Sequence, residues 1–378
     1  MVKVSDLVAE FLKEKQIEVV FGIIGSANSH LFDSINKLGY TKIINTHHEQ
    51  AAVMAMGAYY RSSGKMSASI VTAGAGASNA VTGIVSNWAD SIPGIIISGN
   101  EGSNYIKEQE HLRMYGTQGF NIAKMVKDVT KWSHCLLDEN DTQHQLEFCY
   151  QISNMDRKGP VLLDIPFDIQ SKNITPRPWS PFIQTPNIHS KDGTKYIINQ
   201  INKAKKPLIL GGNGVRLSDS KDQFNRFINQ TKLPTTLTWS GIDLLESDND
   251  NFYGRFGLYG QRASNFIVQN CDLLIVLGSR LALPQTGYDF DQFVREGKII
   301  IIDISKPQFS SDKIDKWFRS DCRDVLNELV NNINLINPIN PVWKEYCNSI
   351  RTEYPWIDKE HEHNTHYTNS YQFIHKLI

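Results

Sequence analysis

The sequence predicts an α/β fold with two doubly wound domains, each a parallel sheet covered by helices, plus the start of a truncated third α/β domain. Short strands that are apolar throughout alternate with amphipathic helices, which is typical of parallel sheets buried on both faces. A chain of 378 residues also exceeds the size of most single cores. The expected regions are a first domain at 1–170, a linker at 171–189, a second domain at 190–332, and a further linker with the start of the third domain at 333–378.

The first domain is expected to open with an amphipathic helix from Ser5 to about Gln16. Leu7, Val8 and Phe11 fall on one face of this helix. Ser5 is of a residue type that caps helix N-termini. The other expected elements are strand 19–24, helix 30–36, strand 42–45, helix 49–62, strand 67–71, loop 72–78, a helix through 81–88, strand 94–98 and a last strand at 159–164.

The linker is predicted from four prolines and few periodic apolar positions between residues 171 and 189. A second alternating set follows, and it is expected to end near Asn332. Residues 371–378 look like a helix that has just begun, so we expect the chain to stop inside a third domain. The strands expected in the second domain are 207–210, 273–277 and 298–303.

Charge and composition exclude several classes of protein. Lys+Arg 39 against Asp+Glu 40 leaves a net charge of -1, which disfavours a nucleic acid partner. No apolar stretch is long enough for a bilayer, and the charged N-terminus does not resemble a signal peptide. Five cysteines without Cys-x-x-Cys spacing suggest neither a disulfide framework nor a zinc site. We therefore expect a cytoplasmic protein with no membrane partner.

Two loops of small residues follow strands of the first domain. Gly25 and Ser26 lie between a strand and a helix, where the carboxyl end of a parallel sheet usually presents its ligand crevice. A plain tight turn is the alternative. The loop at 72–79, Thr-Ala-Gly-Ala-Gly-Ala-Ser-Asn, allows either close ligand contact or tight helix packing. It matches neither the P-loop nor the dinucleotide-binding motif.

Glu49 follows a strand and begins a helix whose first turns are rich in small residues. Close packing of that helix is expected to place Glu49 inside the protein rather than on its surface. The alternative is a carboxylate that only complements the helix dipole.

Together these features resemble the pyrimidine-binding domain of thiamine-diphosphate enzymes, in the superfamily of acetolactate synthase, pyruvate oxidase and benzoylformate decarboxylase. Residues 190–332 resemble the central domain of the same enzymes. The strings that carry the resemblance are Phe21-Gly-Ile-Ile-Gly25, His48-Glu-Gln-Ala-Ala52, Ala58-Tyr-Tyr-Arg-Ser-Ser-Gly-Lys65, Thr72 to Asn79, Gln118, Gly159-Pro-Val-Leu-Leu-Asp-Ile-Pro166, Gly211-Gly212, Gly257-Leu-Tyr-Gly260, Gly278-Ser-Arg280 and Asp303-Ile304.

The resemblance implies roles for three residues as catalytic groups. The residue matching Glu49 hydrogen-bonds N1′ of the aminopyrimidine and favours the imino tautomer that removes the proton from thiazolium C2. Gln118 matches a glutamine on the substrate side of the thiazolium, with an exposed loop residue as the alternative. His48, more than His47, adjoins the site, but a histidine bonded to backbone is the commoner outcome.

The resemblance also implies cofactors. Relatives either wrap FAD with the central-domain loops or keep that pocket empty or filled by a nucleotide, and both alternatives stay open here. In the family, Mg²⁺ and the diphosphate are held by a third domain, so no metal ligand is expected in this chain. The cluster from His361 to His366 is read as a metal site or, more simply, as a solvated run. The implied contacts are Gly25, Ser26, Glu49, Thr72, Gly74 and Asn79 for thiamine diphosphate, and Gly211, Gly212, Leu258, Gly278, Arg280, Asp303 and Ile304 for FAD.

The implied function is a carboligase that moves a two-carbon unit from a 2-oxo acid such as pyruvate to a carbonyl acceptor, in acetolactate-type or sugar-nucleotide biosynthesis. Gly119, Ala75 and Phe167 depart from the family pattern and argue against anabolic acetolactate synthase itself. The alternatives are a simple 2-oxo acid decarboxylase and a non-catalytic assembly or regulatory partner. Family members are homodimers or homotetramers with the active site between subunits, so we expect residues 1–378 alone to be inert.

Overall fold

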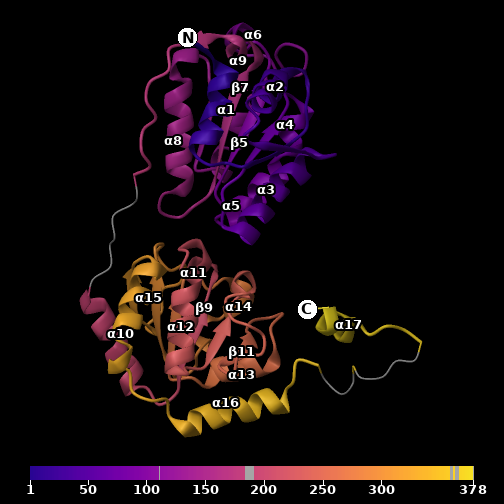
Figure 1. Cartoon of the computed structure of the whole chain (residues 1–378). Coiled ribbons are helices and arrows are strands. Elements are labelled where there is room, and N and C mark those ends of the chain that lie inside the picture. Colours follow the sequence, from indigo (N-terminus) through magenta and orange to yellow (C-terminus); the bar gives the residue numbers. More distant parts are fainter. Residues whose placement is uncertain (110, 184–190, 358–360, 362–365, 378) are drawn as a thin grey trace. The chain divides into compact units, whose positions relative to one another are not determined.

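The computed structural model describes the chain except for residues 110, 184–190, 358–360, 362–365 and 378. The chain forms two compact units, Met1–Thr185 and Pro186–Ile378. Each contains a six-stranded parallel sheet between helices (Figure 1). The doubly wound α/β class expected from the sequence is therefore confirmed for these units.

The first unit has a sheet with the strand order β3-β2-β4-β5-β7-β6. All five pairings in it are parallel. The chain goes from β2 to β3 on one side and then to β4 on the other, which makes the gap between β2 and β4 a topological switch point. Ligands of open α/β sheets bind outside the carboxyl ends of strands at such points. The strands are β2 (Val19–Gly22), β3 (Lys42–Asn45), β4 (Ala68–Val71), β5 (Gly94–Asn100), β6 (Trp132–Cys135) and β7 (Pro160–Pro166).

Helices cover both faces of this sheet (Figure 1). The helices α1, α2, α8 and α9 contribute to one apolar cluster, and α3, α4, α5 and α7 contribute to the other. Both faces of the central strands are thereby removed from water, which explains why β4, β5 and β7 are buried along their whole length. The helices are α1 (Val4–Glu14), α2 (Ser29–Leu38), α3 (Glu49–Ser63), α4 (Ala75–Asn79), α5 (Val81–Ala89), α6 (Ser103–Glu108), α7 (Ile122–Met125), α8 (Thr142–Asn154) and α9 (Phe167–Ser171).

Several details of the first unit differ from expectation. Ser5 is not the N-cap of α1: the helix begins at Val4, and Ser5 is buried inside it, where its hydroxyl accepts a 2.8 Å hydrogen bond from Ser34 Oγ. The loop expected at 72–78 is shorter, because α4 already begins at Ala75. The strand ending at Pro166 is not the last, because β8 (Asn173–Ile174) pairs antiparallel with β1 (Val2–Lys3).

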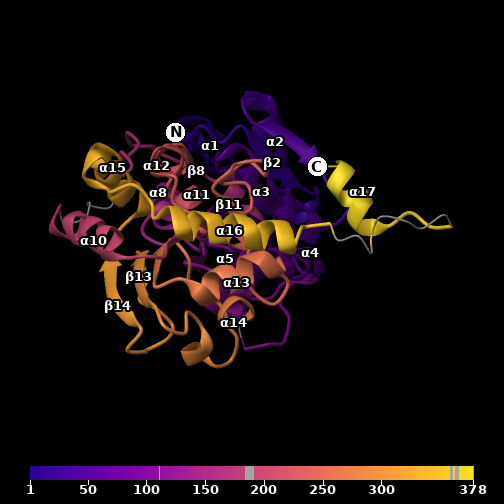
Figure 2. The same cartoon turned by 90° about the horizontal axis from the view of Figure 1, so that it is seen from below.

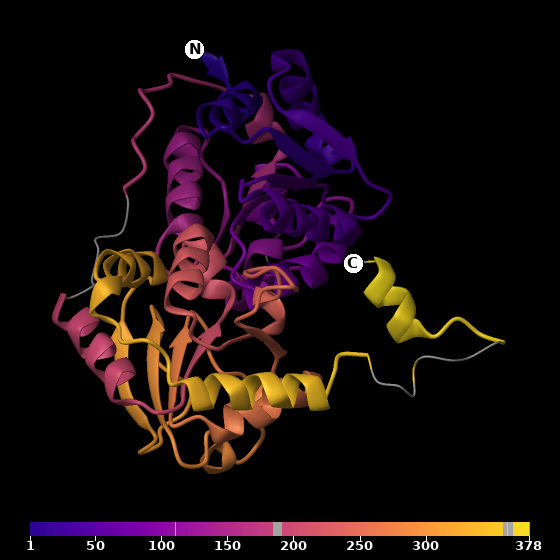
Figure 3. The same cartoon turned by 60° about the horizontal axis from the view of Figure 1, so that its bottom comes forward.

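The second unit repeats the architecture with the strand order β11-β10-β9-β12-β13-β14, again all parallel. Its switch point lies between β9 and β12. Figure 3 shows the strands of this unit with helices around them. The elements are α10 (Lys191–Lys203), β9 (Pro207–Gly211), α11 (Asn213–Leu217), α12 (Lys221–Thr231), β10 (Thr235–Leu237), β11 (Phe252–Arg255), α13 (Arg262–Asn270), β12 (Leu273–Leu277), α14 (Leu283–Thr286), β13 (Lys298–Asp303), β14 (Ile314–Arg319), α15 (Cys322–Asn331), α16 (Pro341–Glu353) and α17 (Ser370–Leu377).

Parts of both expected linkers pack on the units. Trp179 contacts Phe11 with ring centroids 5.6 Å apart, so the proline-rich stretch lies against the first unit there. The second unit extends past Asn332: α16 runs beside α13, and Trp343 and Cys347 are buried in an apolar cluster (Figure 2). This packing was not predicted, because the low-complexity sequence before α16 indicated a linker. No helix in the described part of the chain is both long and apolar enough to cross a membrane.

Candidate active site

The carboxyl ends of β2 and β4 bring together residues that are far apart in the sequence. A Cβ atom added to Gly25 would lie 2.5 Å from Thr72 Oγ1, so the two loops touch and only glycine fits. A Cβ added to Gly76 would lie 2.7 Å from Thr72 Cγ2 and 3.2 Å from Glu49 Oε1. The switch point therefore joins the Gly25 loop, the Thr72 loop and the first residue of α3.

Glu49 stands at the start of α3, where its carboxylate complements the exposed backbone amides. Asn79 Nδ2 donates a 3.0 Å hydrogen bond to Glu49 Oε2. The expectation that Glu49 lies inside the protein is met only in part, because the residue is half-buried. The small residues do pack α3 closely against α5, but α3 begins at the edge of the sheet, so its first side chain faces out of the layer.

Gln118 reaches the same edge from the segment after β5. Its carbonyl oxygen would lie 2.7 Å from a Cβ atom on Gly74, which has a φ of +69° and so favours glycine. Gln118 Nε2 donates to the carbonyl of Ala73 at 3.4 Å, and its backbone N–H donates to Glu101 Oε1 at 3.1 Å. The side chain is otherwise exposed, as expected for a loop residue. It also lies beside the candidate site, as expected for a residue on the substrate side.

Asn28 and Glu101 take part in the site without having been expected from the sequence. Asn28 Oδ1 accepts from Gly25 N at 2.8 Å, and its Nδ2 donates to the Ile23 carbonyl at 3.0 Å, which rigidifies the turn before the exposed Ser26. The sequence signal for this turn was the side-chain amide of Asn28, three residues after Gly25. Glu101 had none, because its partner Gln118 lies 17 residues away.

His48 is the N-cap of α3. Its Nδ1 accepts a 3.1 Å hydrogen bond from the backbone N–H of Gln50, so the neutral ring carries its proton on Nε2. The backbone-bonded alternative for His48 is thus realised, and the residue is exposed. His47 is exposed as well.

Replacing His48 by Ala is expected to lower the free energy of unfolding by about 1 kcal/mol, because the first turn of α3 loses its cap. Urea denaturation measures this loss. His48→Asn is the matched control, since an asparagine oxygen can accept the same bond, and it should keep most of the stability. Equal losses in both variants would contradict the capping role.

The implied FAD residues gather only in part. Gly212 and Gly278 lie at the ends of β9 and β12, and Gly214 N donates to the Gly278 carbonyl at 2.9 Å. A Cβ on Gly278, whose φ is +63°, would lie 2.5 Å from Gly214 Cα. Close backbone contacts thus explain Gly212 and Gly278, whereas a Cβ on Gly211 would instead meet the side chains of Leu237 and Phe224, both at 2.8 Å. Of the remaining implied contacts, Leu258 and Arg280 are exposed, and Asp303 and Ile304 are half-buried at the end of β13.

The residues at the first switch point fit the aminopyrimidine half of thiamine diphosphate. Thr72 Oγ1 is buried without a hydrogen-bond partner among the described residues, so a polar ligand atom would satisfy it. Gly25 and Gly76 let the Thr72 side chain pack closely between the two loops. Glu49 Oε1 faces this position while Oε2 is held by Asn79. For FAD, the second switch point offers no comparable orphaned atom among the described residues.

The metal alternative at the histidine cluster falls largely on residues 362–365, which lie outside the described part of the chain. His361 contacts the ring of Tyr371 with centroids 4.3 Å apart. Within the described residues, no group of three or more His, Cys, Asp or Glu side chains is arranged to hold a metal ion.

Two regions of the chain match models of one protein family. Residues 2–125 match the N-terminal TPP binding domain of thiamine pyrophosphate enzymes, and residues 194–329 match their central domain. Together the matches take up more than half of the chain. The chain belongs to the thiamine pyrophosphate enzymes. The resemblance drawn from the sequence is therefore confirmed, and the orphaned Thr72 hydroxyl lies inside the region matched to the TPP binding domain.

Curated relatives of this thiamine pyrophosphate enzyme include acetolactate synthases. The chain is 28% identical over 353 residues to the acetolactate synthase isozyme 2 large subunit of Escherichia coli, covering 92% of the chain and 62% of the relative. It is 30% identical over 317 residues to the large subunit of Haemophilus influenzae, covering 82% and 54%. The chloroplastic acetolactate synthase of Arabidopsis thaliana is 29% identical over 321 residues, covering 82% and 46%. The chain thus spans less than two thirds of the length of each.

Proposed function

We propose that this chain supplies the aminopyrimidine-binding half of the active site of a thiamine-dependent carboligase. The observation that carries the proposal is the convergence of Glu49, the orphaned Thr72 hydroxyl and two close glycines at the first switch point. This arrangement combines a carboxylate, an unsatisfied buried hydroxyl and closely packed backbone in one position.

The residues of the chain have distinct tasks in this proposal. Glu49 Oε1 holds a proton shared with the pyrimidine nitrogen N1′, while the hydrogen bond from Asn79 fixes the orientation of the carboxylate. Thr72 Oγ1 would bond a polar atom of the ring, and Gly25 and Gly76 let Thr72 pack in that position. The bound thiamine supplies the nucleophilic carbon and the electron sink. Gln118, held against Gly74, orients the substrate.

The substrate class follows from the relatives, whose names state acetolactate synthesis. We propose a 2-oxo acid donor, with pyruvate as the first candidate, and a carbonyl acceptor that is either a second 2-oxo acid or a keto-sugar nucleotide. Phe167 and Gly119 stand where the family pattern has Lys and Glu, which favours an acceptor other than that of anabolic acetolactate synthase. The proposal includes Mg²⁺ held outside residues 1–378 and a homodimer or homotetramer in the cytoplasm. It does not depend on FAD, and a central unit with or without this cofactor stays compatible with it.

Product analysis tests the proposed function. The assembled enzyme that contains this chain is incubated with pyruvate, thiamine diphosphate, Mg²⁺ and candidate carbonyl acceptors. We expect products with a new carbon–carbon bond. Acetaldehyde as the only product would instead identify a decarboxylase, and the absence of any pyruvate consumption would favour a non-catalytic partner. An absorption spectrum of the purified protein decides whether flavin is present.

A further inference from the structure

Asp164 is a buried carboxylate that the proposed function does not use. It is fully buried on β7, between β5 and the edge strand β6, on the same sheet face as Leu162, which packs with α7. Ser98 Oγ on β5 donates to Asp164 Oδ1 at 2.5 Å, and Asn100 Nδ2 donates to Oδ2. The Cys135 thiol of β6 is a third partner. A carboxylate with three donors from two neighbouring strands is built into the sheet, and a buried charge is expensive unless it is hydrogen-bonded in this way.

Asn100 connects this carboxylate to the segment that carries Gln118. Asn100 is buried at the carboxyl end of β5, and its Nδ2 also lies 3.3 Å from both Tyr115 Oη and the Phe120 carbonyl. Because the amide has two N–H groups, one serves Asp164 and the other is shared by the two oxygens. Asn100 Oδ1 in turn accepts from Glu101 N at 2.9 Å.

The segment reached by Asn100 is a tight hairpin around Gln118. Tyr115 N donates to the Gly119 carbonyl at 2.9 Å, and Gly119 N donates back to Tyr115 at 2.8 Å. Glu101 closes the arrangement, since its carboxylate accepts from Gln118 N at 3.1 Å. The chain of contacts therefore runs from Asp164 through Asn100 to both ends of the hairpin and to Gln118.

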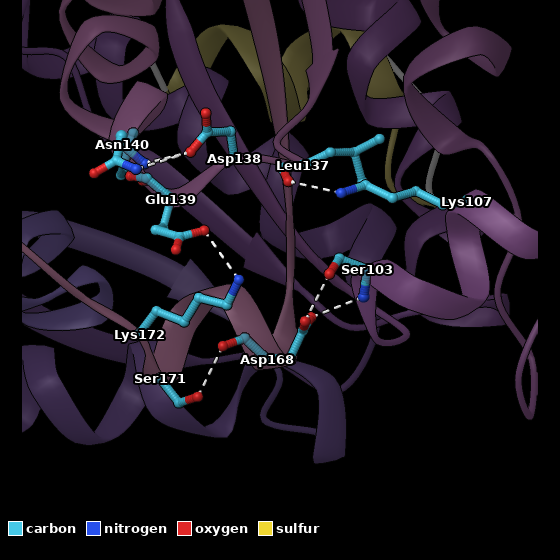
Figure 4. Close-up of polar contacts among 10 residues, drawn as sticks. Ser103, Lys107, Leu137, Asp138, Glu139, Asn140, Asp168, Ser171 and Lys172 are labelled. Atoms are coloured by element: carbon cyan, nitrogen blue, oxygen red, sulfur yellow. Dashed lines mark hydrogen bonds and ion pairs between the residues drawn. The ribbon is translucent and has the colours of Figure 1, made fainter.

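A second carboxylate fixes the near end of the same segment. Asp168 of α9 accepts hydrogen bonds from Ser103 N at 2.8 Å and Ser103 Oγ at 2.7 Å, where α6 begins (Figure 4). Asp168 thus anchors the backbone just after Asn100 without contacting Asn100 itself. Asp164 therefore acts on the hairpin through Asn100, while Glu101 contacts Gln118 N directly.

We propose that Asp164 is a positioning residue for Gln118, and that its ionised form holds the 115–119 hairpin against the candidate active site through Asn100. A hydrogen bond to an ionised carboxylate is stronger than one to the neutral acid. Protonation of Asp164 consequently loosens Asn100 and the hairpin. The importance of Gln118 for substrate rests on the proposed function, whereas the order of the hairpin does not.

The titration of Asp164 falls in an accessible range. Burial raises its pKa from 3.8 to about 6, against the lowering effect of the bonds from Ser98, Asn100 and Cys135. Cys135 is the titratable group that contacts it, and burial raises the pKa of that thiol, so the thiol stays neutral. On the side of the hairpin, the titratable groups that contact Asn100 are Tyr115 and Glu101. The native state binds the Asp164 proton more tightly than the unfolded state, so this group's contribution to global stability decreases as pH rises from 3.8 to about 6.

Global stability and hairpin order are therefore expected to respond to acid in opposite directions, which a merely structural carboxylate would not produce. Hydrogen exchange measured by mass spectrometry on the purified chain, corrected for intrinsic rates, reads the protection of the 115–119 amides without any cofactor. We expect protection in the original sequence to fall about tenfold on going from about pH 7.5 to about pH 5. Asp164→Asn should show the low protection at both pH values. Urea denaturation of both proteins measures the global free energy of unfolding separately.

Matched variants make the outcome decisive. Asp138→Asn removes an exposed carboxylate of the same unit that caps a turn through Asn140 N, and it should leave hairpin protection unchanged (Figure 4). Asn100→Ser breaks the connection from the other side and should lower protection at every pH, even if Asp164→Asn folds poorly. Unchanged hairpin protection in Asn100→Ser, or pH-dependent protection retained in Asp164→Asn, would overturn the positioning role. Neither result depends on thiamine chemistry, so failure of the proposed function would be seen separately in the product analysis.

Discussion

Replacing Glu49 by Gln in the assembled enzyme is expected to lower turnover by a factor of about a hundred or more, the typical contribution of a positioned acid–base group. The amide can still accept the hydrogen bond from Asn79 that Glu49 Oε2 accepts at 3.0 Å, so the fold and the site geometry should survive. What the variant loses is a carboxylate able to hold a proton against N1′. Steady-state consumption of pyruvate measures turnover, and deuterium exchange at C2 of bound thiamine diphosphate measures the proton step directly.

A matched carboxylate tests whether charge at a helix start is enough to explain the effect. Asp222 lies exposed in the first turn of α12 in the other unit, where it complements that helix as Glu49 complements α3. Asp222→Asn should leave turnover and C2 exchange unchanged. Full activity in Glu49→Gln would remove the acid–base role and support a non-catalytic assembly or regulatory partner.

Burial on both faces explains why some strands were predicted well. β12 and β13 were expected with their observed bounds because a strand buried on both faces is apolar throughout. β3 was also expected with its observed bounds, although it is an edge strand whose residues are exposed or half-buried. The strands β10 and β11 were missed although they are largely buried. The edge strands β6 and β14 were also missed. These two are only partly buried, and the side chains of β14, Ile-Asp-Lys-Trp-Phe-Arg, mix polar and apolar types without a clear run.

The candidate site was predicted as far as short motifs reach. Glu49, the Thr72 loop and the Gly25 loop each follow a strand, and parallel strands bring such loops to one edge. The partial exposure of Glu49 could not be predicted, because it depends on where α3 begins relative to that edge. The connection from Asp164 to Gln118 joins residues 46 positions apart through contacts across strands, and a single sequence contains no signal for such contacts.

Gly99 brings the Gly25 turn into its position. It lies in β5, next to Asn100, and a methyl group added there would overlap the carbonyl group of Ala27 and approach Asn28 N to 2.9 Å. Ala27 cannot simply move away, because its carbonyl accepts a 2.8 Å hydrogen bond from Gln170 Nε2, and Gln170 is fully buried. The backbone of the turn that contains Gly25 is thus held between β5 and α9.

Replacing Gly99 by Ala is therefore expected to lower the free energy of unfolding by about 3 kcal/mol, the upper range for overpacking a well-packed core. Urea denaturation measures the loss, and any variant that folds should also bind thiamine diphosphate more weakly in the assembled enzyme, because the Gly25 turn is displaced from Thr72. Gly159→Ala is the matched control: the atoms nearest its added methyl belong to side chains rather than to backbone, and the nearest is Lys131 Cγ at 3.1 Å. Stability of Gly99→Ala equal to that of Gly159→Ala would show that the turn moves freely, and the close approach of β5 would then not be what positions Gly25.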